Sequence, residues 1–146
     1  AASTLPDIYG AEKLNKAYHL EANNFSTVLI KNKKGHAFEI ENLPIQAQFS
    51  PTLSFETLDI NNDGFLDVFG VGNVYEAEIE TIRYDASKGY VLLGNSDGKF
   101  SYYNDLSYFN ETEAKAIKKI VINKQPHLII LNKRSAMKIL KLNSNF

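Results

Sequence analysis

From residue 25 onward, short β-type runs alternate with turn residues, and this feature constrains the fold more than any other. Each run has six to eleven residues rich in Val, Ile, Leu, Phe and Tyr, and Gly, Asn and Asp lie between the runs. Such runs favour extended strands, and turn residues at this spacing favour antiparallel connections. We therefore predict an all-β fold. The nine expected strands are 25–32, 36–43, 53–60, 65–75, 89–95, 99–104, 116–123, 127–133 and 137–142.

The N-terminal segment has a different pattern from the rest of the chain. Within residues 5–20, Leu14, Ala17 and Tyr18 recur at roughly helical spacing. Gly10 interrupts this pattern, because glycine is a poor helix former. We predict a short helix here with a weak point at Gly10.

Two of the connections between predicted strands resemble each other. "LIKNKKGHAF" and "LLGNSDGKF" share an apolar pair, an asparagine, a glycine and an aromatic residue in the same order. Asn32 and Asn95 are 63 residues apart, and so are Gly35 and Gly98. The sequence therefore contains an internal repeat, and each glycine suits a tight hairpin turn.

The repeat divides this single domain into three units. The expected units are a partial one at 25–50, a complete one at 51–106 with an insertion at 73–90, and a three-stranded one at 112–142. The predicted strand is apolar on both faces around Leu66, Val68, Phe69 and Val71, which favours a sheet covered on both sides. Radially stacked four-stranded blades of a β-propeller provide that environment, so we expect a partial propeller.

The loop "DINNDGFLD" places oxygen-bearing groups at alternating positions. The candidate ligands are the side chains of Asp59, Asn61, Asp63 and Asp67 and the main-chain carbonyl of Phe65. Hard oxygen donors with this spacing can surround one cation, and the number of donors suits Ca²⁺ better than Mg²⁺. We therefore expect one calcium site.

An EF-hand and a plain polar turn are the two alternative interpretations of this loop. An EF-hand needs a bidentate glutamate at the twelfth position, but Gly70 occupies it and strands flank the loop. A plain polar turn is the other alternative, since Asn, Asp and Gly favour turns for backbone reasons. Three carboxylates within nine residues repel each other, and a bound cation relieves that repulsion.

The motifs "DINNDGFLDVFGVGN", "NSDGKF" and "RYDASKGYVLLGN" resemble the FG-GAP/VCBS repeats of integrin-alpha-like β-propellers. The resemblance covers about residues 5–142 and is nearer still to C-terminal repeats associated with an ASPIC/UnbV-type domain. It implies calcium ligands at the same five loop positions and a bacterial extracellular, cell-surface or periplasmic location. The chain departs from the family pattern after residue 114, where no second metal loop is present.

The long segment between the fourth and fifth predicted strands, "NVYEAEIETIRYDASKGY", is rich in charged and aromatic residues. Arg83, Tyr84 and Asp85 are its candidate ligand-binding residues, because long polar loops are often recognition loops. The alternative is structural, with Arg83 and Asp85 fixing the insertion by hydrogen bonds and Tyr84 packing beneath it.

Composition and motifs argue against several classes of function. Sixteen basic and seventeen acidic residues leave a net charge of −1, which favours neither nucleic acid nor membrane binding. Cysteine is absent, the three histidines are scattered, and neither a nucleophile elbow nor a phosphate-binding loop is present. No apolar run reaches the length of a membrane span, and "AASTLPDIYG" lacks the basic and apolar regions of a signal peptide. The small-residue start, Ala1-Ala2-Ser3, is compatible with a mature end from which an export signal has been removed.

The expected function is therefore that of a non-catalytic, calcium-binding propeller segment that serves as a scaffold for protein or carbohydrate recognition. One alternative is part of a glycan-active enzyme with the acidic insertion near its cleft, and another is a purely structural repeat. Because so few strands cannot close a propeller, we expect a fragment of a larger chain or self-association. The open edges would lie near residues 25–31 and 137–142.

Overall fold

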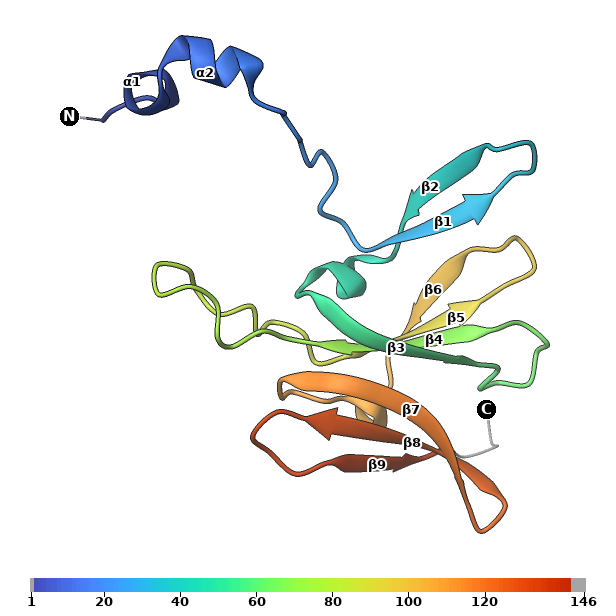
Figure 1. Ribbon diagram of the computed structural model, residues 1–146. Helices are drawn as coiled ribbons and strands as arrows, with labels where there is room; N and C mark the ends of the chain where they lie inside the picture. The colour runs from blue at the N-terminus through green and yellow to red at the C-terminus, as the bar shows by residue number, and fades with distance from the viewer. Residues whose placement is uncertain (1, 143–146) are drawn as a thin grey trace.

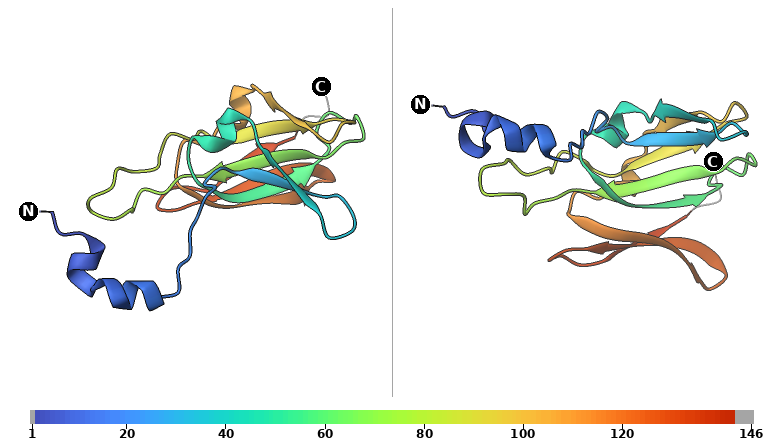
Figure 2. Two further views of the ribbon diagram at one scale, coloured as in Figure 1. Left: turned by 90° about the horizontal axis from the view of Figure 1, so that it is seen from above. Right: turned by 45° about the horizontal axis from the view of Figure 1, so that its top comes forward.

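A computed structural model describes residues 2–142, and Ala1 and residues 143–146 lie outside the described part. The fold is mostly β, with all nine expected strands present in three antiparallel sheets that are stacked as layers (Figures 1 and 2). The first sheet contains β1 (Val28–Asn32) and β2 (Phe38–Asn42). The middle sheet contains β3 (Thr52–Leu58), β4 (Asp67–Gly72), β5 (Tyr90–Gly94) and β6 (Phe100–Tyr103). The third sheet contains β7 (Ala114–Ile122), β8 (Gln125–Asn132) and β9 (Lys138–Lys141).

Short 3₁₀ helices follow the first and middle sheets, η1 (Ile45–Gln48) and η2 (Leu106–Tyr108). Each sheet is paired in chain order, so every strand lies beside its neighbour in sequence. A closed ring of sheets is not seen in residues 2–142 (Figure 1). The structure thus shows the all-β class and the layered sheets, and the propeller remains a prediction.

The N-terminal segment forms two very short helices, α1 (Leu5–Tyr9) and α2 (Ala11–Lys16). They are separated at Gly10, whose φ of 83° ends the first helix, so the predicted weak point is confirmed. Neither helix buries a residue, and both lie away from the three sheets (Figure 1). The apolar spacing of this segment therefore does not contribute to the core.

The middle and third sheets have the same strand layout. In each, the first strand contains a register shift near its start, between Thr52 and Ser54 or between Ala114 and Ala116. Rows of paired residues across the first three strands also correspond. The matching rows are Glu56, Phe69 and Val91 in the middle sheet and Lys118, Ile129 and Ile139 in the third.

The first sheet matches β5 and β6 with a small difference from the sequence repeat. Asn32 pairs with Phe38, and Gly94 pairs with Phe100, so these strand residues correspond at a spacing of 62 rather than 63. Both turns have five residues, 33–37 and 95–99, but Asn32 is the last residue of β1 whereas Asn95 is the first residue of the β5–β6 turn. Side chains at Ile30, Phe38 and Ile40 therefore correspond to those at Leu92, Phe100 and Tyr102.

The hydrophobic core has two parts, one on each face of the middle sheet. The larger cluster joins Phe69, Val71 and Val91 to Ile117 and Leu128 of the third sheet, among other residues. The smaller cluster contains Ala47, Tyr90 and Leu92, with Leu43 and Phe100 packed against it. The middle sheet is therefore covered on both faces, as its continuous apolar β4 strand predicts.

Charge is divided unevenly between the sheets. Residues 51–111, which include the middle sheet, contain eleven acidic and three basic residues. Residues 112–142, which include the third sheet, contain one acidic and eight basic residues. An ion pair between Lys118 and Glu56 at 3.3 Å joins the two sheets. The small net charge of the chain therefore conceals two oppositely charged layers.

Candidate functional site

The acidic loop joins β3 to β4 at the same end of the sheets as the β1–β2 and β5–β6 turns (Figure 1). Its side-chain oxygens turn toward the loop's own backbone. The Asp63 N–H donates to Asp59 Oδ1 at 3.1 Å and to Asn61 Oδ1 at 3.2 Å, and the Gly64 N–H donates to Asp59 Oδ2 at 2.9 Å. Asp63 Oδ1 accepts the Phe65 N–H at 2.8 Å. Three oxygen-bearing side chains are thus gathered around one short stretch of backbone.

Asp67 is fully buried at the start of β4, unlike the other four candidate ligand residues. Its Oδ2 accepts the Ile60 N–H at 2.7 Å, and its Oδ1 accepts the Gly94 N–H at 2.9 Å. A Cβ at position 94 would lie 2.4 Å from the Leu66 carbonyl oxygen, so only glycine permits this close approach. Asp67 therefore links the start of the loop, at Ile60, to the start of β4, and it also links the loop to the end of β5.

The environment of Asp67 disfavours its charge. Burial raises the pKa of the Asp67 carboxyl group, and the nearby negative charges of Asp63 and Asp59 raise it further. The hydrogen bonds from Ile60 and Gly94 act in the opposite direction. A cation in this loop would offset the repulsion among the three carboxylates.

The donor set of the loop decides whether the loop can hold Ca²⁺. Among residues 2–142, no three His, Cys, Asp or Glu side chains form a group that could hold a metal ion. The loop does supply carboxylate oxygens from Asp59 and Asp63 and an amide oxygen from Asn61, which are hard donors of the type that Ca²⁺ uses. Each carboxylate oxygen retains a second lone pair beside its hydrogen bond. The chemistry of the donors therefore fits Ca²⁺, with Asp67 also serving as the buried anchor of the loop.

The insertion, residues 73–89, leaves the sheets at the end opposite the acidic loop (Figure 1). Its base is fixed by a two-way backbone pairing between Val74 and Tyr84 and by the Ser50 hydroxyl, which donates to the Tyr84 carbonyl at 2.8 Å. Buried Asn73 donates to the Ser87 carbonyl at 2.8 Å and accepts the Ser87 N–H at 3.2 Å. The two ends of the insertion are therefore held together.

The three candidate ligand-binding residues lie on the returning arm of the insertion. The Arg83 guanidinium lies over the Tyr75 ring, 5.5 Å from its centroid. Tyr84 contributes its backbone to the base while its side chain is exposed, and Asp85 is also exposed. The structure thus gives Arg83 an internal contact and leaves the side chains of Tyr84 and Asp85 accessible.

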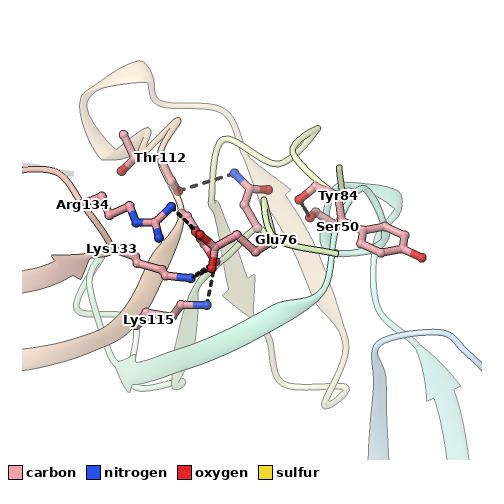
Figure 3. Close-up of polar contacts among 9 residues, drawn as sticks. Ser50, Glu76, Tyr84, Thr112, Lys115, Lys133 and Arg134 are labelled. Carbon is pink, nitrogen blue, oxygen red and sulfur yellow. Dashed lines mark hydrogen bonds and ion pairs between the residues drawn. The ribbon is translucent and has the colours of Figure 1, made fainter. Parts of the chain in front are cut away.

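A charged cluster joins the insertion to the third sheet (Figure 3). Glu76 forms ion pairs with Lys133 and Arg134 in the β8–β9 turn. Glu113, a buried residue just before β7, pairs with Lys115 Nζ at 2.7 Å and lies 3.9 Å from Lys133 Nζ. The Lys115 ammonium lowers the pKa of the Glu113 carboxyl group, as do Lys133 and the Tyr75 N–H. The base of the insertion therefore rests on the third sheet.

Sequence reasoning did not find the roles of Asn73 and Glu113. Both are buried polar residues, and each has a partner more than ten residues away in the sequence, Ser87 for Asn73 and Lys133 for Glu113. Asn73 carried one signal, because an asparagine directly after an apolar strand can adopt positive φ, and its φ is 80°. Glu113 is the single acidic residue in an otherwise basic stretch, which is a signal for a paired, buried carboxylate.

No protein-family model, curated protein or solved structure matches this chain. Within residues 2–142, none of the helices is long and apolar enough to cross a membrane.

Proposed function

We propose that this chain is a non-catalytic, calcium-binding segment of FG-GAP/VCBS-like β-propeller repeats from a secreted or cell-surface protein. In this role it is a scaffold that presents a recognition surface to a protein or carbohydrate. Layered antiparallel sheets with matching strand layouts support the repeat architecture. The oxygen donors of the β3–β4 loop support the calcium site.

The observation that carries the proposal is the concentration of oxygen donors in the β3–β4 loop, because the corresponding strands of the third sheet are connected without such donors. Strands β7 and β8, which correspond to β3 and β4, are joined by only two residues, Asn123 and Lys124. The loop between β3 and β4 instead gathers the side chains of Asp59, Asn61 and Asp63. Mutual repulsion of carboxylates makes this arrangement unfavourable without a cation.

Thermal unfolding with and without calcium tests the proposal. If Kd is on the order of 0.1 mM, as in extracellular modules, about 1 mM Ca²⁺ should stabilise the fold by roughly 1.4 kcal/mol. In chelator, Asp63→Asn should leave the melting temperature unchanged or slightly raised, because it removes one repelling charge. In calcium, the same variant should lose the stabilisation.

Asp97→Asn is the matched control, since Asp97 lies in the β5–β6 turn and its N–H donates to Asn95 Oδ1, the same kind of turn bond that joins Asp63 to Asn61. This control should respond to calcium as the wild type does. Equal melting temperatures for the wild type in calcium, in magnesium and in chelator would refute the calcium site.

The recognition role is assigned to the insertion. Its two ends are fixed by the Val74–Tyr84 pairing and by Glu76, while its outer part exposes Ile79 and Ile82 and its base exposes the Tyr84 side chain. A firmly held base reduces the entropy lost when a partner binds. Exposed aromatic and aliphatic groups with neighbouring charges are typical of such surfaces.

A further inference from the structure

Both outer faces of the stack of sheets carry exposed apolar side chains that no other part of residues 2–142 covers. On the first sheet, Ile30 and Ile40 are paired across the strands and are 59% and 61% exposed, and Phe38 beside them is 65% exposed. On the third sheet, Leu131 and Ile139 are 48% and 46% exposed. We call the face of a sheet that points toward the preceding sheet its leading face, and the opposite face its trailing face.

Each uncovered face has a covered counterpart on the middle sheet. The leading face of the middle sheet carries Leu92, Phe100 and Tyr102, which pack with Leu43 and Ala47 directly after β2. These three residues correspond in strand register to Ile30, Phe38 and Ile40. The leading face of the first sheet is thus built like a face that another sheet covers.

The trailing faces correspond in the same way. Phe69, Val71 and Val91 on the middle sheet are almost fully buried against the third sheet. Their counterparts in strand register on the third sheet are Ile129, Leu131 and Ile139. The molecule therefore has one uncovered face of each kind, and these two kinds pack on each other inside the chain.

We infer that a second copy of this chain covers these faces, with the trailing face of one copy packing on the leading face of the next. The contact continues the sheet-on-sheet packing already present between the middle and third sheets. Residues directed to the leading face of the first sheet include no charge, because Val28, Asn32 and Asn42 accompany the exposed apolar residues. Lys118 and Lys141, which the strand register places on the trailing face of the third sheet, therefore meet no like charge there.

This contact is heterologous, because it joins two different surfaces. Each copy contributes three sheets, so two copies would align six, a number within the range of known propellers. The open regions predicted from the sequence, near residues 25–31 and 137–142, both lie in this contact or at its border. The inference does not depend on the calcium site.

Sedimentation velocity of the intact chain between about 1 and 100 µM tests the inference. The wild type should associate with increasing concentration. Ile40→Glu on the leading face and Leu131→Glu on the trailing face should each weaken association by about a hundredfold or more, because each would bury an unpaired charge. Ile79→Glu is the matched control, as Ile79 is exposed at the insertion and lies on neither face. Circular dichroism and melting curves establish that each variant is folded.

An equimolar mixture of the Ile40→Glu and Leu131→Glu variants provides the decisive measurement. Each variant keeps one intact face, so the mixture should form a one-to-one dimer that grows no further. A monomeric wild type across the concentration range overturns the inference. Self-association that persists in folded Ile40→Glu alone or in folded Leu131→Glu alone also overturns it. So does self-association that only Ile79→Glu abolishes.

Discussion

The middle and third sheets share a strand layout but differ in both connections that their second strand makes. Strands β3 and β4 are joined by eight residues, 59–66, whereas β7 and β8 are joined by two, 123 and 124. Both residues of the short turn have positive φ, 50° and 64°, as a tight hairpin turn requires. The strand layout itself therefore needs only a minimal turn at this point.

The second connection differs in the same direction. Residues 73–89 separate β4 from β5, whereas only 133–137 separate β8 from β9. The short connection supplies Lys133 and Arg134, which pair with Glu76 in the long one. Because the third sheet folds with short turns, the additional length in the middle sheet serves other purposes. The β3–β4 loop gathers oxygen donors, and the insertion, residues 73–89, extends from the sheets as an exposed arm.

The largest effect is expected where the acidic loop enters the core. Asp67→Ala leaves the N–H groups of Ile60 and Gly94 without their partner. The free energy of unfolding in chelator should therefore be about 3 kcal/mol lower than that of the wild type. His127 holds the corresponding position in the third sheet, since Ile120 pairs with His127 as Leu58 pairs with Asp67. His127→Ala should change stability by less than about 1 kcal/mol. Urea unfolding measures the stability of both variants. Equal losses of stability in Asp67→Ala and His127→Ala would show that the β3–β4 loop is not anchored more strongly than the β7–β8 turn.

A smaller effect concerns the joint between the long insertion and the third sheet. The Lys115 ammonium and other groups lower the pKa of Glu113 in the folded state, so its ionised form stabilises the fold. This contribution is complete above the unfolded pKa of about 4.3 and is lost as the pH falls through the lower folded pKa. Glu113→Gln should flatten the decline in stability between about pH 5 and 3.

Glu111→Gln is the control for this measurement. The Lys88 ammonium lowers the pKa of Glu111 too, but that pair is exposed, so solvent screens it. Its substitution should alter the pH dependence less than Glu113→Gln does. The reverse order would show that the buried carboxylate is not what joins the insertion to the third sheet.

The smallest effect is expected on the exposed arm. Arg83→Ala removes the contact with the Tyr75 ring, and an exposed cation–π contact contributes roughly 0.5–1 kcal/mol. Chemical unfolding should therefore detect a loss below about 1 kcal/mol. A loss of several kcal/mol would assign Arg83 to internal packing rather than to the recognition surface.

Local patterns in the sequence predicted the strands, but not the long-range partners of the site. The β3–β4 loop was found because Asp59, Asn61 and Asp63 alternate within a few residues. The burial of Asp67 was not foreseen, because its second partner, Gly94, is 27 residues away. The exposure of α1 and α2 was also missed, since apolar spacing predicts a helix face and does not identify what covers it.

The opposite charges of the middle and third sheets give the molecule a large electric dipole moment. The sequence pI of about 6.3 suggests a protein with little preference for charged surfaces near neutral pH. With eleven acidic residues in one region and eight basic residues in the next, the molecule presents an acidic region to an anion-exchange resin and a basic region to a cation-exchange resin. Near its isoelectric point, where net repulsion between molecules vanishes, such dipoles align head to tail at low ionic strength. Salt concentration therefore governs how the chain behaves in solution more than its net charge does.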